Sequence, residues 1–371
     1  MGDGAGLQMT GPSPTKEEVM PKTTTAKELA KEINKALGTN TLHLGSDESL
    51  VVTTIPTGVL PIDYLLGGGI PRGRFTEFFG AYSTLKSYIA LSAIAECQAD
   101  GGMCAIIDTE HAYDPEWATK IGVNTNELIY QAPTTGEEAM DVSEVLIRSE
   151  IDLLVWDSVA AMVPQAESNK RMHGESVQPA RLAALMSTGL RKLTTANTNT
   201  AVIFINQTRL NVGQMFGDPE TVPGGKALPF YASHRVALRR AGRIKEGRKV
   251  IDSEGKQANI NEVLGHKVRA TLEKSKLTAP AKDVLFTFTL NDGAVDETGF
   301  AITQGLIDGH IKHEGRKWWL NIAGVEDDHT VGFAKFRERL EKDMMSLSKL
   351  KKEITNSYSR GPQLQDNVKG D

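Results

Sequence analysis

The sequence predicts an α/β protein whose core is a mostly parallel β-sheet with helices on both faces. Three apolar runs without polar alternation are typical of strands that are buried on both sides. They are residues 104–107, 152–156 and 201–205. Segments with helical spacing of apolar residues precede and separate these runs, and they are residues 86–99, 137–149 and 181–196. This alternation of helix and strand favours parallel pairing.

The ends of the chain carry less of the core. Residues 1–25 are poor in apolar side chains, so we expect them to be mobile. From Ala26 to Leu37 apolar residues recur every three or four positions, which predicts an amphipathic helix ending at Gly38. We expect this helix to pack against a neighbouring subunit. After Phe300 we expect short helices around Trp318 and Trp319 in a small separate unit, and then a polar segment that frays from residue 343 onward.

Composition limits the class of protein. The 40% hydrophobic and 24% charged residues are ordinary for a soluble globular chain, and no apolar run is long enough to span a membrane. Residues 1–23 lack the apolar core of a signal peptide. Cys97 and Cys104 lie in apolar segments without metal-ligand spacing, so we expect buried thiols in a reducing cytoplasm. The net charge of −5 means that any DNA affinity must come from local clusters.

The most informative motif follows the predicted strand at 74–79. It nearly matches a phosphate-binding loop, which requires Gly, four free positions, Gly, Lys, and Ser or Thr between a strand and a helix. Lys86 can bind the β- and γ-phosphates, and Ser87 can offer its hydroxyl to Mg²⁺. The predicted nucleotide-binding residues are Gly80, Ala81, Tyr82, Ser83, Thr84, Leu85, Lys86 and Ser87. Taken alone, so short a pattern can also arise by chance.

Leu85 stands where the pattern has its second glycine. We expect Leu85 to adopt a φ below zero and to turn its side chain away from the phosphates, against Ile89 and Leu91. Under this interpretation the leucine leaves the loop functional.

Three further polar residues follow predicted strands. In parallel sheets ligands bind beyond the carboxyl ends of the strands, so Glu110, Asp157 and Gln207 are expected near the phosphate loop. Glu110 can activate water, Asp157 can hold Mg²⁺, and Gln207 can contact a γ-phosphate. Each residue also has a simpler interpretation. Glu110 can cap a helix, Asp157 can form a turn, and Gln207 can hydrogen-bond the local backbone.

With these motifs in order, the sequence resembles the RecA family of homologous-recombination ATPases, and more loosely its phage branch. The resemblance covers about residues 26–345. It rests on the runs GGGIPRGR at 67–74, IDTEHAYDP at 107–115, VWDSVAA at 155–161, FINQTR at 204–209, GQMFGDPET at 213–221 and FYAS at 230–233.

The resemblance implies a RecA-type P-loop ATPase core that uses ATP and Mg²⁺. Lys86 and Ser87 would bind phosphate and metal, Glu110 would be the base, Asp157 the metal-binding acid and Gln207 the γ-phosphate sensor. Asp114 and Trp117 match positions that contact adenine, although both also fit ordinary helix-start chemistry. Lys274 and Lys276 match paired lysines that reach the neighbouring subunit's γ-phosphate. Without the resemblance they would pass for exposed strand lysines.

Two loops of the family bind single-stranded DNA, and they match residues 165–179 and 206–230 here. The candidate contacts in the second loop are Arg209, Met215, Phe216, Gly224 and Gly225. Glycines admit a phosphate backbone and an apolar side chain can wedge between bases. A mobile surface loop is the alternative.

A basic cluster at 239–249 can support phosphate contact, or it can be a solvated turn.

The sequence therefore predicts an ATP-dependent strand-exchange protein that forms helical filaments on single-stranded DNA and also engages duplex DNA. Single-strand-binding and mediator proteins are possible partners. A ring-forming helicase motor of the DnaB type and a degenerate, non-hydrolysing relative are the alternatives. The expected domains are a mobile N-terminus with an oligomerisation helix at 1–50, the ATPase core at 51–298, a small α+β domain at 299–345 and a polar tail at 346–371.

Overall fold

A computed structural model describes residues 25–168, 179–210, 220–251, 257–279, 282–325 and 329–359. The chain divides into two compact units, Met1–Val52 and Thr53–Asp371, which are described separately. Among the described residues, no helix combines the length and the apolar character that crossing a membrane would require.

The N-terminal unit contains α1 (Ala26–Leu37) and a short 3₁₀ turn at Glu48–Leu50. The hydroxyl of Thr25 caps α1 by accepting the Glu28 N–H at 3.4 Å and donating to the Glu28 carboxylate at 2.6 Å. Gly38 ends the helix with a φ of 61°, a left-handed conformation that glycine adopts at little cost. Both predicted helix ends are confirmed. Packing of α1 on a second subunit stays a prediction.

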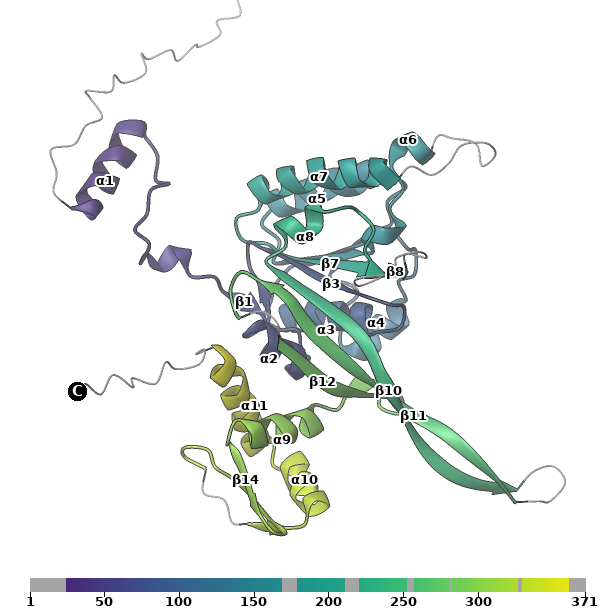
Figure 1. The fold of residues 1–371 in the computed structure, drawn as a ribbon. Coiled ribbons are helices and arrows are strands. Elements are labelled where there is room, and N and C mark those ends of the chain that lie inside the picture. Colours follow the sequence, from purple (N-terminus) through teal and green to yellow (C-terminus); the bar gives the residue numbers. More distant parts are fainter. Residues whose placement is uncertain are drawn as a thin grey trace, which may run out of the picture. The chain divides into compact units, whose positions relative to one another are not determined.

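In the described part of the second unit, one nine-stranded sheet forms the core (Figure 1). Its spatial order is β13, β12, β11, β10, β3, β7, β6, β4, β5. The strands are β3 (Phe75–Gly80), β4 (Cys104–Asp108), β5 (Leu128–Gln131), β6 (Leu153–Asp157), β7 (Ala201–Gln207), β10 (His234–Ile251), β11 (Gln257–Ser275), β12 (Lys282–Thr289) and β13 (Ala294–Val295). Strands from β10 to β5 pair in parallel, and the other edge is antiparallel. The predicted mostly parallel sheet is confirmed.

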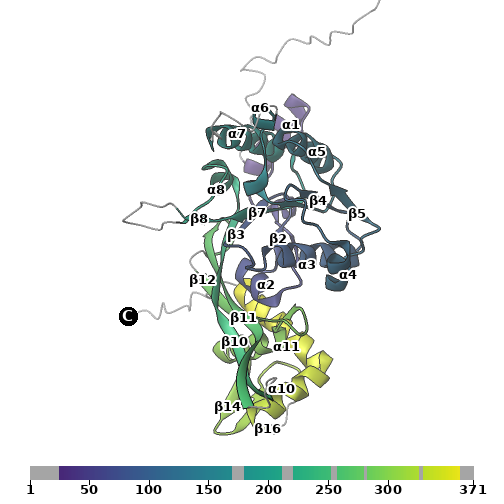
Figure 2. The same ribbon diagram turned by 90° about the vertical axis from the view of Figure 1, so that its right-hand side faces the viewer.

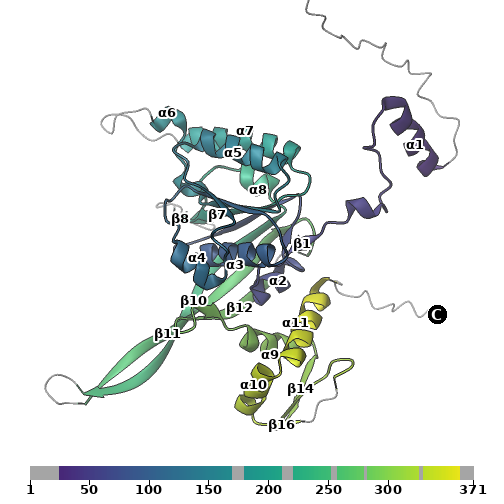
Figure 3. The same cartoon turned by 180° about the vertical axis from the view of Figure 1, so that it is seen from behind.

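Helices cover both faces of this sheet (Figures 1 and 3). One face carries α2 (Leu60–Leu66), α3 (Lys86–Ala99) and α4 (Pro115–Ile121); the other carries α5 (Gly136–Arg148), α7 (Pro179–Ala196) and α8 (Ala227–Tyr231). Successive strand residues face opposite sides of the sheet. Phe78 therefore packs in the apolar cluster on the α3 side, here called the α3 core, whereas Phe75 packs in the cluster on the α7 side, the α7 core. The helix predicted at 86–99 is confirmed to the residue.

Smaller elements connect the larger ones. They are β1 (Thr54–Ile55), β2 (Ile70–Pro71), the 3₁₀ turn at Val159–Ala161, α6 (Gln165–Ser168), β8 (Arg209–Leu210) and β9 (Glu220–Thr221). Strand β8 pairs with β9 at the base of the second predicted DNA loop. Cys97 and Cys104 are both buried free thiols, as predicted.

The β10–β11 hairpin is longer than the sheet that supports it. Strand β3 pairs only with His234–Leu238, and β12 pairs only with Gly265–Leu272, so the outer part of the hairpin pairs with itself alone. Figure 2 shows this antiparallel edge from the side. The basic cluster predicted at 239–249 reaches this outer part from residue 245 onward, whereas its first half lies opposite β11 residues that still pair with β12.

The segment after Phe300 differs from the expectation. Trp318 and Trp319 lie on a strand, β15 (Lys317–Leu320), which pairs with β14 (Ile311–Glu314) and β16 (Thr330–Val331). The expected short helices at these tryptophans are therefore wrong. Aromatic residues favour pleated, half-buried strands, and Gly315, with a φ of 57°, makes the tight turn between β14 and β15.

The expected fraying from residue 343 is also wrong for residues 344–359, which form α11 (Met344–Ser359). Leu347, Leu350 and Ile354 recur at helical spacing and are buried, because α11 packs on α2 and α9 (Glu297–Ile307). Helix α10 (Phe333–Lys342) contacts both α9 and α11.

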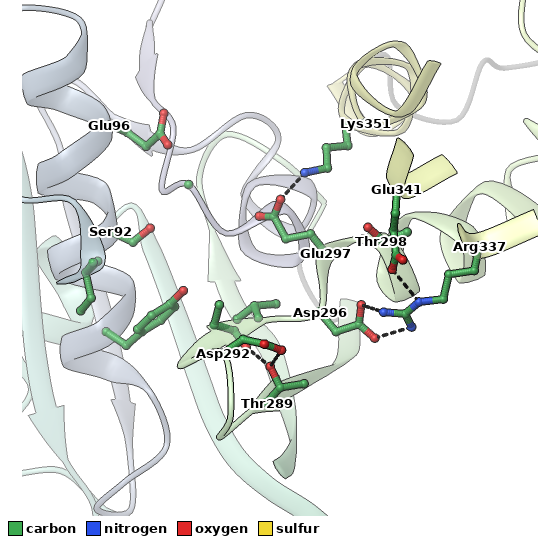
Figure 4. A pocket seen from close by; sticks show the side chains of 15 residues that line it. Ser92, Glu96, Thr289, Asp292, Asp296, Glu297, Thr298, Arg337, Glu341 and Lys351 are labelled. Atoms are coloured by element: carbon green, nitrogen blue, oxygen red, sulfur yellow. Dashed lines mark hydrogen bonds and ion pairs between the residues drawn. The ribbon is translucent and has the colours of Figure 1, made fainter. Parts of the chain in front are cut away.

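Ion pairs join these helices to the start of α9 around a cavity of about 500 Å³ (Figure 4). Arg337 of α10 binds both oxygens of Asp296, at 2.9 and 3.0 Å. Lys351 of α11 pairs with Glu297, whose other oxygen accepts the Leu60 N–H at 3.1 Å. These contacts fix α10 and α11 on the sheet-bearing part of the same unit.

His234 is a buried polar residue at the start of β10. Its side chain is 0% exposed, and among the described residues neither ring nitrogen has a hydrogen-bond partner. Burial lowers the pKa of His234 to about 4, from an ordinary value of 6.5. The imidazole is therefore neutral in the folded protein at pH 7.

This burial predicts acid lability. Below pH 6.5 the imidazole of His234 is protonated in the unfolded chain but stays neutral in the folded chain. The free energy of unfolding therefore falls progressively down to about pH 4, by about 3 kcal/mol in total. His234→Leu should raise the free energy of unfolding at pH 5 more than at pH 7, as measured by urea denaturation. His329→Leu, at an exposed histidine, is the control. An equal effect of His234→Leu at both pH values would contradict this account.

Candidate functional site

One pocket lies at the carboxyl edge of the parallel strands. Strands β3, β4, β6 and β7 run in the same direction and end at Gly80, Asp108, Asp157 and Gln207. The pocket, of about 510 Å³, is lined by Tyr82, Ser83, Thr84, Leu85, Lys86, Ser87, Tyr88, Glu110, Trp117, Asp157, Ile205, Gln207, His266, Phe288 and Leu290. The structure therefore brings together all five residues predicted to handle the phosphates, metal and water.

The loop between β3 and α3 folds around the ammonium group of Lys86. The ammonium of Lys86 donates to the carbonyls of Gly80 at 3.1 Å and Ala81 at 2.8 Å, and to the Thr84 hydroxyl at 3.3 Å. Burial lowers the pKa of Lys86, while the carboxylates of Asp157 and Glu110 oppose this shift. The ammonium thus lies inside the loop, where it can exchange carbonyl contacts for phosphate oxygens.

Leu85 does not adopt the predicted conformation. Its φ is 71° and its ψ is 14°, in the left-handed region, so the expectation of a negative φ is wrong. Leu85 closes the tight loop around the Lys86 ammonium, at the position where the phosphate-loop pattern has a glycine, which adopts a positive φ at little cost. A left-handed non-glycine residue costs about 1–2 kcal/mol. The Leu85 side chain is half-buried against the α3 core and also lines the pocket.

Ser87 and Asp157 form the candidate metal site. The Ser87 hydroxyl donates to the Asp157 carboxylate at 2.7 Å. Burial raises the pKa of Asp157 to about 6, and the hydrogen bond from Ser87 opposes the shift. A hydroxyl and a carboxylate are the hard oxygen ligands that Mg²⁺ prefers, and a divalent cation would offset the burial of this charge. The donor set therefore fits Mg²⁺.

Glu110 lies between two donors. One of its oxygens, Oε1, accepts hydrogen bonds from Ser158 Oγ and Gln207 Nε2, each at 2.5 Å. Asp108 supports the same turn, because its carboxylate accepts the backbone N–H groups of Glu110 and Tyr113. Sequence reasoning missed Asp108 and Ser158, although both lie within two residues of predicted site residues in the two strand-end motifs.

The far end of the pocket is apolar. Trp117 is 38% exposed and lines the pocket, whereas Asp114 caps α4 by accepting the N–H groups of Glu116 and Trp117. The capping alternative for Asp114 thus has direct support, and its carboxylate is exposed. Other pocket residues here went unpredicted, namely Tyr88, His266, Phe288 and Leu290. They lie on α3, β11 and the end of β12, and no motif marked them in the sequence.

Lys274 and Lys276 are not in the pocket. Lys274 pairs with Arg235 near the start of β10, whereas Gly80 lies beside Leu238, about 10 Å further along the strand. The Lys274 ammonium donates to the carbonyls of Pro229 and Phe230 at 2.6 and 2.8 Å. Both residues lie in the last turn of α8. The Lys276 ammonium donates to the carbonyl of Tyr231 at 3.4 Å. Burial and the neighbouring charge of Lys276 lower the pKa of Lys274.

The predicted DNA loops are described in part. Arg209 is exposed on β8. Gly224 and Gly225 have φ values of 92° and 74°, and a Cβ on Gly225 would lie 2.8 Å from Ala183 of α7, so packing also demands glycine there. Met215 and Phe216 lie outside the described residues, as does most of the first loop.

Comparison with known proteins agrees with this geometry. A family model described as the RecA N-terminal domain matches residues 24–295. Protein RecA of Blastochloris viridis is 44% identical over 325 residues, covering 85% of this chain and 88% of that protein. Protein RecA of Rhizobium leguminosarum bv. viciae is 42% identical over 302 residues, covering 80% and 82%.

Protein RecA of Mesorhizobium japonicum is 43% identical over 290 residues, covering 76% of this chain and 75% of that protein. The matched region contains the phosphate loop and the ends of β4, β6 and β7. The chain therefore belongs to the RecA family of homologous-recombination proteins.

Proposed function

We propose that this protein is an ATP-dependent strand-exchange recombinase that forms helical filaments on single-stranded DNA and hydrolyses ATP between subunits. The observation that carries the proposal is the single pocket in which Lys86, Ser87, Glu110, Asp157 and Gln207 meet. A phosphate loop, a metal-binding acid, a base and an amide sensor together form the minimal apparatus for nucleotide hydrolysis.

Each group has a defined task. Lys86 binds the β- and γ-phosphates after leaving its carbonyl contacts, and the N-terminus of α3 adds favourable partial charge. Ser87 and Asp157 would hold Mg²⁺, which would supply charge neutralisation at the phosphates. The carboxylate of Glu110 accepts the proton of the attacking water. Trp117 and Leu290 supply an apolar surface on which a purine can stack.

Gln207 couples nucleotide to DNA in this proposal. Its amide donates to Glu110, and it ends β7 at the start of the second DNA loop, two residues before Arg209. A γ-phosphate offers a charged acceptor that competes for the same amide. Transfer of the amide to that phosphate would pull on the loop, and this differential contact favours the DNA-binding state.

Lys274 and Lys276 fit a role in a neighbouring subunit. Their backbone positions are displaced from the chain's own phosphate loop toward the opposite edge of the sheet, so they cannot readily serve it. A lysine from the next subunit would stabilise negative charge as the phosphoryl group departs, as an arginine finger does. We also propose the cytoplasmic setting, the N-terminal segment at 1–50 and the ATPase core at 51–298; the small C-terminal domain extends through α11 to Ser359.

The alternatives separate by experiment. Electron microscopy with single-stranded DNA and a non-hydrolysable ATP analogue should show helical filaments, whereas closed hexamers would favour a ring helicase. Single-stranded DNA should stimulate ATP turnover in a coupled assay. Intact filaments without ATP turnover would favour the degenerate, non-hydrolysing relative. The left-handed conformation of Leu85 is the observation that motivates this alternative.

Removing the basicity of Glu110 should separate assembly from hydrolysis. Glu110→Gln keeps the size of the side chain and an acceptor for Ser158, so filaments should still form with ATP. Turnover should fall on the order of 10²-fold or more, the scale of a lost general base. If assembly and turnover fail together, Glu110 has a structural role instead.

A shared site predicts rescue by mixing. Lys86→Ala and Lys276→Ala subunits should each be inactive alone, because every interface lacks one lysine. Mixed filaments contain some interfaces with an intact loop and an intact Lys276, so turnover should partly return at intermediate ratios. Co-assembly is verified by fluorescence energy transfer between labelled subunits. Co-assembled mixtures that stay inactive at all ratios would rule out action between subunits.

A further inference from the structure

Ser158 is a buried polar side chain beside the reacting groups. It follows Asp157 at the end of β6, it is 0% exposed, and its hydroxyl donates to Glu110 Oε1 at 2.5 Å. Nothing in the phosphate-binding apparatus requires a hydroxyl at this position. Among the residues that the structure describes, the Ser158 hydroxyl hydrogen-bonds the carboxylate that we propose as the base.

The backbone of Ser158 is held on both sides by Thr109. The Thr109 hydroxyl accepts the Ser158 N–H at 3.0 Å and donates to the Ser158 carbonyl at 2.5 Å. The Thr109 N–H donates to the Asp157 carbonyl at 2.7 Å. The ends of β4 and β6 are therefore locked together, which fixes the backbone from which the Ser158 hydroxyl reaches Glu110.

The two oxygens of Glu110 are not equivalent. Oε1 accepts from both Ser158 and Gln207, whereas no described residue donates to Oε2. Gln207 must leave Oε1 when it turns to a γ-phosphate, but Ser158 belongs to the locked strand ends and stays. An oxygen that already accepts a hydrogen bond is the poorer proton acceptor.

We propose that Ser158 is a positioning residue that holds Glu110 Oε1 in both states and leaves Oε2 to act as the base. This inference rests on the proposed role of Glu110. In the hydrolytic step the water oxygen bonds to the γ-phosphorus, and one water proton passes to Oε2. The bond from the γ-phosphorus to the bridging oxygen breaks, and ADP departs with that electron pair.

The first test is the kinetics of Ser158→Ala. Without the hydroxyl the carboxylate samples several rotamers, so kcat for DNA-stimulated ATP hydrolysis should fall on the order of 10- to 100-fold, as for a lost hydrogen bond to a charged group. The KM for ATP and filament assembly with a non-hydrolysable analogue should stay unchanged. Ser158→Thr, which retains the hydroxyl, should recover much of the lost rate.

Ser143→Ala is the matched control. Ser143 is also 0% exposed, but its hydroxyl donates to the Ala139 carbonyl within α5, away from the pocket. Its loss should leave kcat unchanged. Thermal denaturation of each variant shows whether it is folded.

A double-mutant cycle with Glu110→Gln decides whether Ser158 acts through Glu110. Single-turnover rates should show that Ser158→Ala has an effect of less than about twofold once Glu110 is glutamine. An equal loss in both backgrounds would overturn the proposal, as would a wild-type kcat in Ser158→Ala. Near wild-type turnover in Glu110→Gln alone would instead overturn Glu110 as the base, which distinguishes failure of the proposed function from failure of this inference.

Discussion

The parallel register of β3, β7, β6 and β4 is the constraint on which the site depends. Parallel pairing places the ends of these strands at one edge, although Gly80 and Gln207 lie far apart in the sequence. A slip of one residue would turn each side chain to the opposite face of the sheet. Glu77 reinforces the register from inside: its buried carboxylate accepts from Arg235 at 2.6 Å and from Asn206 at 3.2 Å, which ties β3 to both its neighbours.

The same hydrogen-bond network reaches the second loop, which we propose to bind DNA. Asn206 also donates to the Pro223 carbonyl at 3.1 Å, so the returning end of the second loop is fixed to the strand that carries Gln207. Lys274 is fixed to Pro229 and Phe230 of α8, a helix that begins two residues after Gly225 of that loop. The pocket, the loop proposed to bind DNA and Lys274 are therefore linked by short connections. A displacement at Gln207 has a direct physical route to each of them.

Charge inside the pocket is arranged for a ligand that carries charge of its own. Lys86 and Asp157 are both buried enough to shift their pKa values toward the neutral forms. Phosphate oxygens would favour the charged lysine and Mg²⁺ would favour the charged aspartate. The left-handed Leu85 is compatible with these contacts, because Lys86 and Ser87 still begin α3 and face the pocket. Its strain is offset by packing of the leucine against the α3 core.

The sequence by itself determined the parallel core, the phosphate loop and the strand-end residues. Continuous apolar runs and local motifs encode these features within a few residues of chain. Only the tertiary structure decided the rest. The backbone geometry at Leu85 comes from the tight loop around Lys86, the strand at Trp318 from its pairing with β14, and the helical order of 344–359 from packing on α2 and α9. Ser158 was equally invisible, because its importance lies in a contact with Glu110, 48 residues away along the chain.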